Sequence, residues 1–245
     1  MAPVKLAFSQ GVPQTKAAAH CDACEIREIS VCRSMAPEEL ARLQAIITSA
    51  YLDAGQAIIH EGDPAENLFN VVSGAVKLYK LLPDGRRQIT GFLFPGDFLG
   101  IALNETYVYT AEALTPVRLC RFPRRRLEAL LKDIPALEHQ LLNEVATELV
   151  AAQDQMLLLG RKTARERVAS FLLMLAKRAE RHGRQVNPVE LPMSRADIAD
   201  YLGLTTETVS RTITQLRQSK TIAAANRGEI EILDQAGLED LSECG

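Results

Sequence analysis

The sequence lacks several features that mark large classes of protein. No stretch approaches the ~20 consecutive apolar residues that a membrane-spanning helix needs. The opening residues "MAPVKLAFSQGVPQTKAAA" contain no continuous apolar run of the kind found in a signal peptide. The chain also has no nucleophile–base constellation and no phosphate-binding glycine loop. We therefore expect a cytoplasmic protein with no membrane partner and no catalytic function.

Cysteine is scarce, with five residues among 245. An odd number of thiols in a reducing compartment argues against a disulfide framework and favours metal or redox chemistry. Cys21, Cys24 and Cys32 lie close together in a C-x2-C-x7-C pattern. A zinc site or a cubane iron–sulfur cluster takes a fourth ligand. The candidates are Cys120 and Cys244, and Cys244, beside the C-terminus, is the expected bystander.

The same thiols are compatible with other chemistry. A structural zinc ion would use them with His20 as a spare ligand. A dithiol pair would form a redox switch without metal, and Cys120 alone would be an ordinary buried core thiol. The rival from the enzyme class is a redox or electron-transfer protein.

The chain changes character along its length, and we expect an α+β fold. Residues 1–35 predict a flexible arm that carries the cysteine cluster. Residues 36–132 contain short β-rich runs punctuated by glycine, as in a sandwich or small barrel. Residues 133–160 predict one long helix, and residues 161–245 are helical with a β-rich end.

One apolar stripe follows the predicted long helix at a period near 3.6 residues. Its members are Leu137, Leu141, Val145, Leu149, Ala152, Met156 and Leu159. A stripe this long and narrow is better explained by a partner helix than by the helix's own small domain. We therefore expect a homodimer with this stripe as its seam, and the alternative is a helix lying along its own barrel.

The stretch "SRADIADYLGLTTETVSRTITQL", residues 194–216, predicts a helix-turn-helix. Ser194 and Asp197 form a capping pair at the start of the first helix. Gly203 supplies a tight turn, and a second helix opens at Thr205 or Thr206. The trailing "TIAAANRGEIEIL" predicts a wing made of two short strands.

The charge pattern gives this half of the chain a candidate ligand. The net charge is only −3, yet residues 161–184 contain eight lysines and arginines against two glutamates. Such a block is either a phosphate-binding surface or a solvated helix face. Glu207, Ser210 and Arg211 lie at i, i+3 and i+4 of the second helix, so one groove can receive all three. The alternative is a plain surface pair between Glu207 and Arg211.

At this point the chain resembles a known family. The segment "GDPAENLFNVVSGAVKLYK…PDGRRQITGFLFPGDFLG" resembles the cyclic-nucleotide-type β-roll of the CRP/FNR transcription regulators. The likeness covers residues 20–235 and includes "ETVSR", a signature of the FNR branch. It implies an N-terminal β-roll, a long dimerisation helix and a C-terminal winged helix-turn-helix that binds double-stranded DNA. It also implies TTGAT-N4-ATCAA-like sites, with Glu207 and Arg211 on the G·C pair and Ser210 near a thymine.

The resemblance also implies a role for the cysteines. Regulators of the FNR branch hold an oxygen-labile [4Fe–4S] cluster on three N-terminal cysteines and one from the roll, and use it to control anaerobic or microaerobic genes. The matching positions here are Cys21, Cys24, Cys32 and Cys120. The better-known members have five residues between the second and third cysteines, whereas this chain has seven. A haem or nitric-oxide sensor on the same scaffold is the rival interpretation.

Two further partners are addressed by the sequence. No arginine occurs between Arg87 and Arg118, so a buried cyclic-nucleotide phosphate would lack a cationic partner, and we expect no cyclic nucleotide. The turn "LPDGRRQ" lies where family members contact RNA polymerase, and the alternative is a plain solvent turn.

Overall fold

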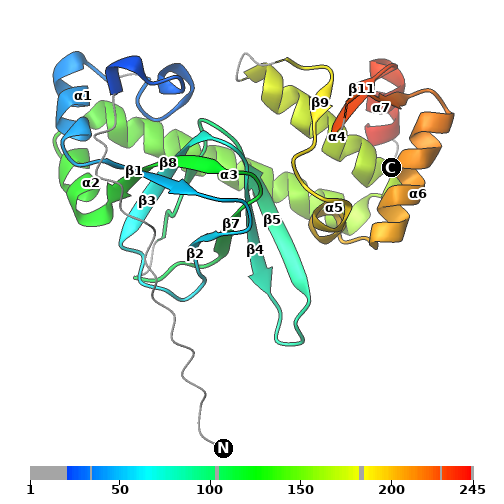
Figure 1. Ribbon diagram of the computed structural model, residues 1–245, viewed down its shortest axis with the longest axis horizontal. Helices are drawn as coiled ribbons and strands as arrows, with labels where there is room; N and C mark the ends of the chain where they lie inside the picture. The colour runs from blue at the N-terminus through cyan, green and yellow to red at the C-terminus, as the bar shows by residue number, and fades with distance from the viewer. Residues whose placement is uncertain (1–20, 34, 103–104, 182–184, 227, 244–245) are drawn as a thin grey trace, which may run out of the picture. The chain divides into compact units, whose positions relative to one another are not determined.

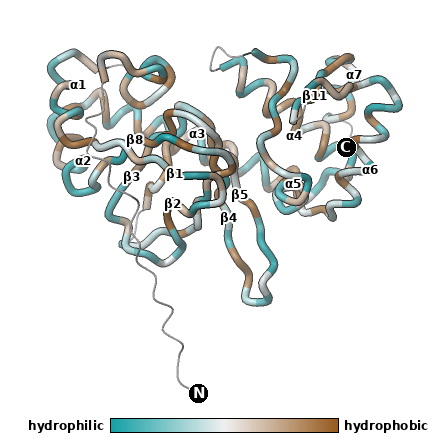
Figure 2. Tube along the Cα trace, in the orientation of Figure 1, coloured by the Kyte–Doolittle hydropathy of each residue, from teal (hydrophilic) through white to brown (hydrophobic). Residues whose placement is uncertain are grey.

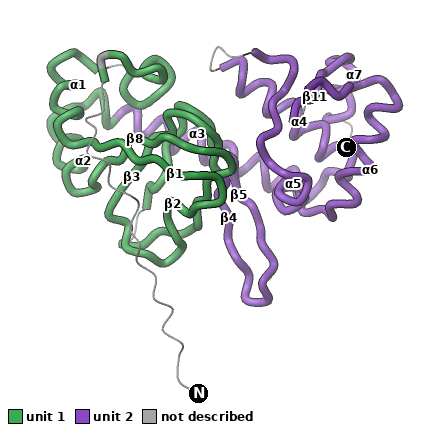
Figure 3. The backbone as a smooth tube through the Cα atoms, viewed as in Figure 1, with its two compact units in different colours: residues 1–76, 93–138 green, residues 77–92, 139–245 purple. Residues whose placement is uncertain are grey.

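The structure is a computed structural model, and it describes residues 21–33, 35–102, 105–181, 185–226 and 228–243. The chain divides into two compact units, residues 1–76 with 93–138 and residues 77–92 with 139–245 (Figure 3). The expectations for His20, for Cys244 and for the arm before Cys21 fall outside the described residues.

The first unit contains an antiparallel four-stranded sheet in the order β1–β8–β3–β6 (Figure 1). A second strand pair, β2 with β7, belongs to the same unit. Strand β3 lies between β8 and β6, and its residues 68–72 are all buried. The strands are β1 Thr48–Leu52, β2 Ala57–Ile59, β3 Asn67–Ser73, β6 Phe98–Leu99, β7 Thr110–Ala113 and β8 Val117–Pro123.

Short helices flank this sheet. The cysteine segment forms two single turns, η1 Cys21–Ala23 and η2 Arg27–Ile29. Helix α1, Pro37–Gln44, starts with a proline at its first position, where a missing N–H does no harm, and buries Leu40 and Leu43. Helix α2, Arg124–Leu131, follows β8 directly.

Helix α3 runs from Pro135 to Arg161 and confirms the long helix expected over residues 133–160. None of the helices in the described ranges is long and apolar enough to cross a bilayer.

The second unit combines the β4–β5 hairpin with the C-terminal helices. Its core is apolar, with Val168, Phe171 and Leu172 of α4 at most 1% exposed. Its small sheet has the order β10–β11–β9. The elements after the hairpin are α4 Ala164–Arg181, β9 Val189–Glu190, α5 Arg195–Leu202, α6 Thr206–Gln218, β10 Ile222–Ala224, β11 Glu229–Ile232 and α7 Gln235–Glu243.

Two features of this unit differ from the sequence-based picture. Helix α7, which packs on α4, was not predicted from the sequence. The hairpin, formed by β4 Val76–Leu81 and β5 Arg87–Leu93, lies within the expected roll domain of residues 36–132, yet residues 77–92 belong to the second unit. Next to its turn, the hairpin is hydrophobic at Leu81 and Leu82 and hydrophilic over residues 86–88, which follow the turn (Figure 2). The expected α+β class is confirmed.

Candidate DNA interface and cysteine site

Helices α5 and α6 form the predicted helix-turn-helix. The Ser194 hydroxyl accepts a hydrogen bond from the Asp197 N–H, and the Asp197 carboxylate accepts one from the Ser194 N–H, both at 3.1 Å. This is the capping pair expected from the sequence. Between the helices Gly203 has φ 61°, and a methyl group there would lie 3.3 Å from Leu159 Cδ2. The tight turn therefore needs glycine.

Helix α6 is held by one buried face. Val209, Ile213 and Leu216 are 0%, 5% and 0% exposed, as their i, i+4, i+7 spacing predicts. At its start the Thr205 hydroxyl accepts a hydrogen bond from the Thr208 N–H at 3.1 Å. The buried face and the capped end fix the direction in which the opposite face points.

The opposite face of α6 presents the predicted DNA-contacting residues. Glu207, Ser210 and Arg211 are all exposed. The Ser210 hydroxyl donates a hydrogen bond to the Thr206 carbonyl oxygen at 2.8 Å. A guanidinium can donate to guanine O6 and N7, and a carboxylate can accept from cytosine N4. This face can therefore distinguish base pairs in a major groove.

Two cations of the basic block serve the fold instead. The Arg167 guanidinium donates to the carbonyl oxygens of Lys162, Leu202 and Leu159 at 2.8 to 2.9 Å. The Lys162 ammonium donates to the Ser170 hydroxyl and the Ser242 carbonyl oxygen. The exposed members Arg161, Arg165, Lys177 and Arg181 are the ones that can meet phosphates.

The apolar stripe of α3 is covered at one end and open in the middle. Leu137 is 0% exposed, so it belongs to the core of its own unit and a partner cannot reach it. Leu141 and Leu159 are half-buried, and Ala152 is exposed. Val145, Leu149 and Met156 are 44%, 58% and 70% exposed. An apolar face this open on a soluble helix marks a contact surface.

Cys21, Cys24, Cys32 and Cys120 line one small cavity in the first unit. Three of them come from the segment 21–33, and the fourth is on β8, opposite Asn70 of β3. Residues directly opposite on paired strands share a face, which places Asn70 in the same cavity wall. The cavity measures about 20 Å³, room for about one water molecule. A larger group would enter only if the segment 21–33 moved outward.

Burial favours the protonated form of two of these thiols, Cys32 and Cys120. Burial raises the pKa of Cys32 to about 11, partly offset by a hydrogen bond with Ser30. Burial raises the pKa of Cys120 to about 12, and the nearby Cys24, Cys21 and Cys32 raise it further. That mutual influence reflects how closely the four sulfur atoms are gathered.

The segment 21–33 is fastened by a few buried side chains. Ile26 and Val31 are 4% and 1% exposed. Glu25 pairs with Arg118 of β8 at 3.5 Å, but the Glu25 side chain is 75% exposed, so this pair contributes little. Gly96, with φ 103°, lies beneath the segment, where a methyl group would come within 2.9 Å of the Ile29 carbonyl oxygen.

Two polar atoms beside the cysteines have no hydrogen-bond partner within the described part of the chain. They are Asn70 Oδ1, on a residue 1% exposed, and Arg27 Nε. Arg27 lies in the seven-residue spacer, and its charge lowers the pKa of the Cys32 thiol. Sequence analysis missed both residues, and only the position of Arg27 between two cysteines gave a signal.

The number of thiols at this cavity favours a metal-containing group, whereas their arrangement does not fit a single metal ion. Across residues 21–243, with their gaps, no group of three or more His, Cys, Asp or Glu side chains is placed to hold a metal ion. Yet four thiols surround one cavity. A single zinc ion requires all its sulfurs within about 2.3 Å, whereas a cluster binds each thiolate to a different iron atom. Four thiols beside the Arg27 guanidinium are compatible with an anionic cluster, whereas the arrangement of the thiols does not fit a lone ion.

Comparison with known proteins matches both halves of the chain. Residues 50–133 match the cyclic nucleotide-binding domain, and residues 166–241 match the Crp-like helix-turn-helix domain. The nitrogen fixation regulation protein FixK of Bradyrhizobium diazoefficiens is 43% identical, over 91% of this chain and 93% of that protein. The transcriptional activator protein FnrL of Cereibacter sphaeroides is 40% identical, over 92% of each chain.

A solved structure agrees in fold. The structure of FixK2 from Bradyrhizobium japonicum has a TM-score of 0.76 and 39% identity, and the match covers 82% of this chain and 99% of that one. The β-roll, long helix and helix-turn-helix expected from the sequence are thereby confirmed. These relatives carry the names of regulators rather than enzymes, as the sequence predicts. The chain belongs to the CRP/FNR family of DNA-binding transcription regulators.

Proposed function

We propose that this protein is a homodimeric, oxygen-responsive transcription activator that holds a [4Fe–4S] cluster and controls anaerobic or microaerobic genes. The observation that carries the proposal is the convergence of Cys21, Cys24, Cys32 and Cys120 on one cavity. Activation is also consistent with the names of relatives, among them the transcriptional activator proteins FnrL and, from Pseudomonas aeruginosa, Anr, which is 37% identical.

The four cysteines would hold the cluster, which supplies oxygen-labile iron–thiolate bonds when bound. Cys21, Cys24 and Cys32 would attach the segment 21–33 to the cluster, and Cys120 would attach β8 to it. Arg27 provides a positive charge beside the thiolates, and the apolar Ile26 and Phe122 keep water from the cavity. The state of the cysteines would then decide how firmly the segment 21–33 is tied to β8.

The DNA site follows from the exposed face of α6. Arg211 donates to guanine and Glu207 accepts from cytosine of the same G·C pair, while Ser210 contributes near the adjacent thymine. A symmetric dimer places two such helices on two half-sites, which gives a palindrome of the type TTGAT-N4-ATCAA.

Dimerisation is assigned to the open part of the α3 stripe. Val145, Leu149 and Met156 are apolar, exposed and on one helix face. A second copy of α3 is the simplest cover for such a face. Replacing Leu149 by glutamate should shift the protein to monomers in analytical ultracentrifugation, whereas glutamate at the exposed Leu82 of the hairpin should leave dimers intact. Dimers of undiminished stability in Leu149→Glu would contradict this seam.

The turn of the hairpin is proposed to contact RNA polymerase. Leu81 and Leu82 are 60% and 44% exposed there, beside the charged Asp84 and Arg86. Leu81→Ala should lower transcription several-fold at equal DNA occupancy. Equal transcription would leave the turn as a solvent loop.

Cyclic nucleotide is not proposed as a ligand, although the domain model bears that name. The Tyr107 hydroxyl donates to the Asn67 carbonyl oxygen at 2.7 Å, and the Tyr109 hydroxyl accepts from the Gly100 N–H at 2.9 Å. These two tyrosines occupy the region that follows "PGDFLG", where a phosphate would need a cation. Calorimetric titration with cyclic AMP should give no heat, and micromolar binding would overturn this point.

The decisive experiment is metal analysis of protein purified without oxygen. We expect about four iron and four sulfide per protomer and a visible absorption that fades in air. The Cys120→Ser variant should lose the iron, the sulfide and the visible absorption, whereas the Cys244→Ser variant, the matched control, should keep all three. Colourless protein containing zinc would replace the cluster by a structural ion, and a Cys120→Ser variant with full iron content would remove Cys120 from the site. A Soret band would favour the haem interpretation.

A further inference from the structure

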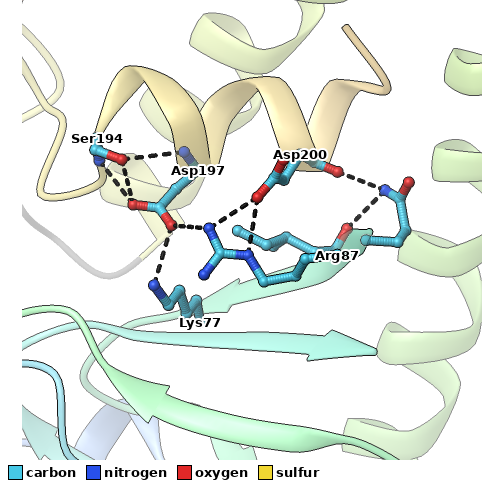
Figure 4. A network of polar contacts seen from close by, with 7 residues as sticks. Lys77, Arg87, Ser194, Asp197 and Asp200 are labelled. Atoms are coloured by element: carbon cyan, nitrogen blue, oxygen red, sulfur yellow. Dashed lines mark hydrogen bonds and ion pairs between the residues drawn. The ribbon is translucent and has the colours of Figure 1, made fainter. Parts of the chain in front are cut away.

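A network of buried and half-buried charges connects the β4–β5 hairpin with helix α5 inside the second unit (Figure 4). The Lys77 ammonium lies 3.0 Å from Asp197 Oδ1, and both side chains are 8% exposed. Arg87 Nη2 lies 3.0 Å from the same carboxylate oxygen. Arg87 also reaches Asp200, with Nε and Nη2 each 2.8 Å from Oδ2. We call Lys77, Arg87, Asp197 and Asp200 the clasp.

The clasp grips α5 at several heights. Asp197 stands in the first turn, where it also caps the helix through Ser194. Asp200 stands one turn later, and its backbone carbonyl accepts a hydrogen bond from Gln88 Nε2 at 2.7 Å. At the base of the hairpin the Phe92 ring lies 5.1 Å from the Tyr201 ring, centroid to centroid. Contacts in the first turn and again one turn later fix both the tilt and the rotation of a helix.

The contacts of Asp197 determine its protonation state. Burial by itself would raise the pKa of Asp197, but hydrogen bonds from Ser194 and Lys77 outweigh it, and the pKa is lowered. Asp197 is therefore ionised, and its charge is balanced by Lys77 and Arg87. Buried charges tolerate little displacement from their partners, because an unpaired charge in the interior is expensive. The clasp therefore fixes the position of α5 as well as attaching this helix to the hairpin.

Helix α5 passes this position on to α6. The two helices pack together, and the turn between them is closed by a hydrogen bond from the Leu204 N–H to the Ala199 carbonyl oxygen at 3.0 Å. A side chain at position 203 would crowd Leu159, because even a methyl group there would lie 3.3 Å from Leu159 Cδ2. With the turn fixed in this way, a rotation of α5 carries α6 with it.

We propose that Lys77 and Arg87 are positioning residues for DNA recognition: through Asp197 and Asp200 the hairpin sets how α6 presents Glu207, Ser210 and Arg211 to the groove. Residues 77–92 lie within the stretch matched by the cyclic nucleotide-binding domain. A displacement of this hairpin would therefore reach the DNA-contacting helix without passing through α3.

The test separates positioning from simple electrostatics. The probe is a duplex that the wild-type protein itself selects from a randomised pool without oxygen, compared with a scrambled duplex of equal length. Arg87→Asp should lower the ratio of the two affinities about tenfold. Asp200→Arg should lower it similarly, although the added positive charge would by itself strengthen binding to any DNA. The double variant Arg87→Asp/Asp200→Arg restores an ion pair between positions 87 and 200 but leaves Asp197 with Lys77 alone, so it should recover part of the lost ratio.

The control is Arg86→Asp. Arg86 neighbours Arg87 but pairs with the exposed Asp84, so the same charge change should leave the ratio unaltered. A second measurement, amide hydrogen exchange of free protein, should show faster exchange in α6 for Arg87→Asp than for Arg86→Asp. If Arg87→Asp fails to fold, Arg87→Lys should reduce the ratio less and in the same direction. An unchanged ratio in the single variants, or no recovery in the double variant, would overturn the proposal.

Discussion

The recognition helix α6 and the cysteine segment 21–33 display their functional side chains in opposite ways. Glu207 and Arg211 project into solvent from a helix whose opposite face is at most 5% exposed. Cys21 is 6% exposed and turned toward a cavity, on a segment fastened by a few buried side chains. A rigid base with exposed groups suits contact with a large fixed surface such as DNA. An inward cluster on a lightly held segment suits a component that can be released.

The comparison implies that damage to one region should spare the other. Each of the following experiments tests that separation, beginning with the largest expected effect.

Leu216→Ala should destabilise the second unit by about 2–5 kcal/mol, because Leu216 is 0% exposed and its removal leaves a cavity. Hydrogen exchange of the α6 amides measures this unit directly. Leu233→Ala, at a leucine 53% exposed, is the matched control and should change stability by less than about 0.5 kcal/mol. Loss of iron content in Leu216→Ala would show that the two regions are not separable.

Arg211→Ala should relax discrimination at the G·C pair of the half-site by about 1–3 kcal/mol. Binding to the consensus duplex and to its G·C substitution gives the quantity. Arg217→Ala, an exposed arginine in the last turn of the same helix, should weaken both duplexes alike. Unchanged discrimination would remove Arg211 from base recognition.

Gly96→Ala should disturb the cysteine segment and spare DNA binding by the second unit. The methyl group would meet the Ile29 carbonyl oxygen at 2.9 Å, in addition to the strain of a positive φ, about 1–2 kcal/mol. Gly62→Ala is the control, since Gly62 has φ 88° and open space around it. We expect faster loss of visible absorption in air for Gly96→Ala than for Gly62→Ala. Equal rates would mean that the segment does not rest on Gly96.

Acid should weaken the second unit through Asp197, and this effect is the smallest. Because the pKa of Asp197 is lowered on folding, its contribution is complete above the ordinary aspartate value of about 3.9 and is lost as pH falls through the folded value. As the pH falls, the unfolding midpoint of the wild-type protein should therefore fall more steeply than that of Asp197→Asn. Near neutral pH the two midpoints should have the same pH dependence. The same pH dependence at every pH would contradict the assignment.

Sequence periodicity predicted the helix-turn-helix and the buried face of its second helix. The spacing of Val209, Ile213 and Leu216 identified the buried face, and the capping pair and Gly203 marked the helix limits, because these are local effects. Helix α7 was missed, although Leu238 inside it is fully buried. Leu137 was placed on the seam because periodicity identifies an apolar stripe and does not say what covers each position.

The cysteine site and the clasp depend on contacts between distant parts of the chain. Nothing local brings Cys120 to Cys21; the need for a fourth ligand and the family resemblance suggested it. Asn70 faces the cysteines because β3 pairs with β8 in a particular register. Lys77 and Arg87 looked like ordinary strand residues, and their carboxylate partners lie more than 100 positions away. Such partnerships follow from topology, which composition and spacing do not encode.

The hydrogen bond from Ser210 to the Thr206 carbonyl limits what this serine can recognise. While its proton is committed to the helix backbone, the oxygen offers only lone pairs to the groove, so it can accept from an amino group and cannot donate to thymine O4. At the proposed thymine its contribution would then be steric, through the Cβ methylene against the 5-methyl group, and uracil at that base pair would be bound less well.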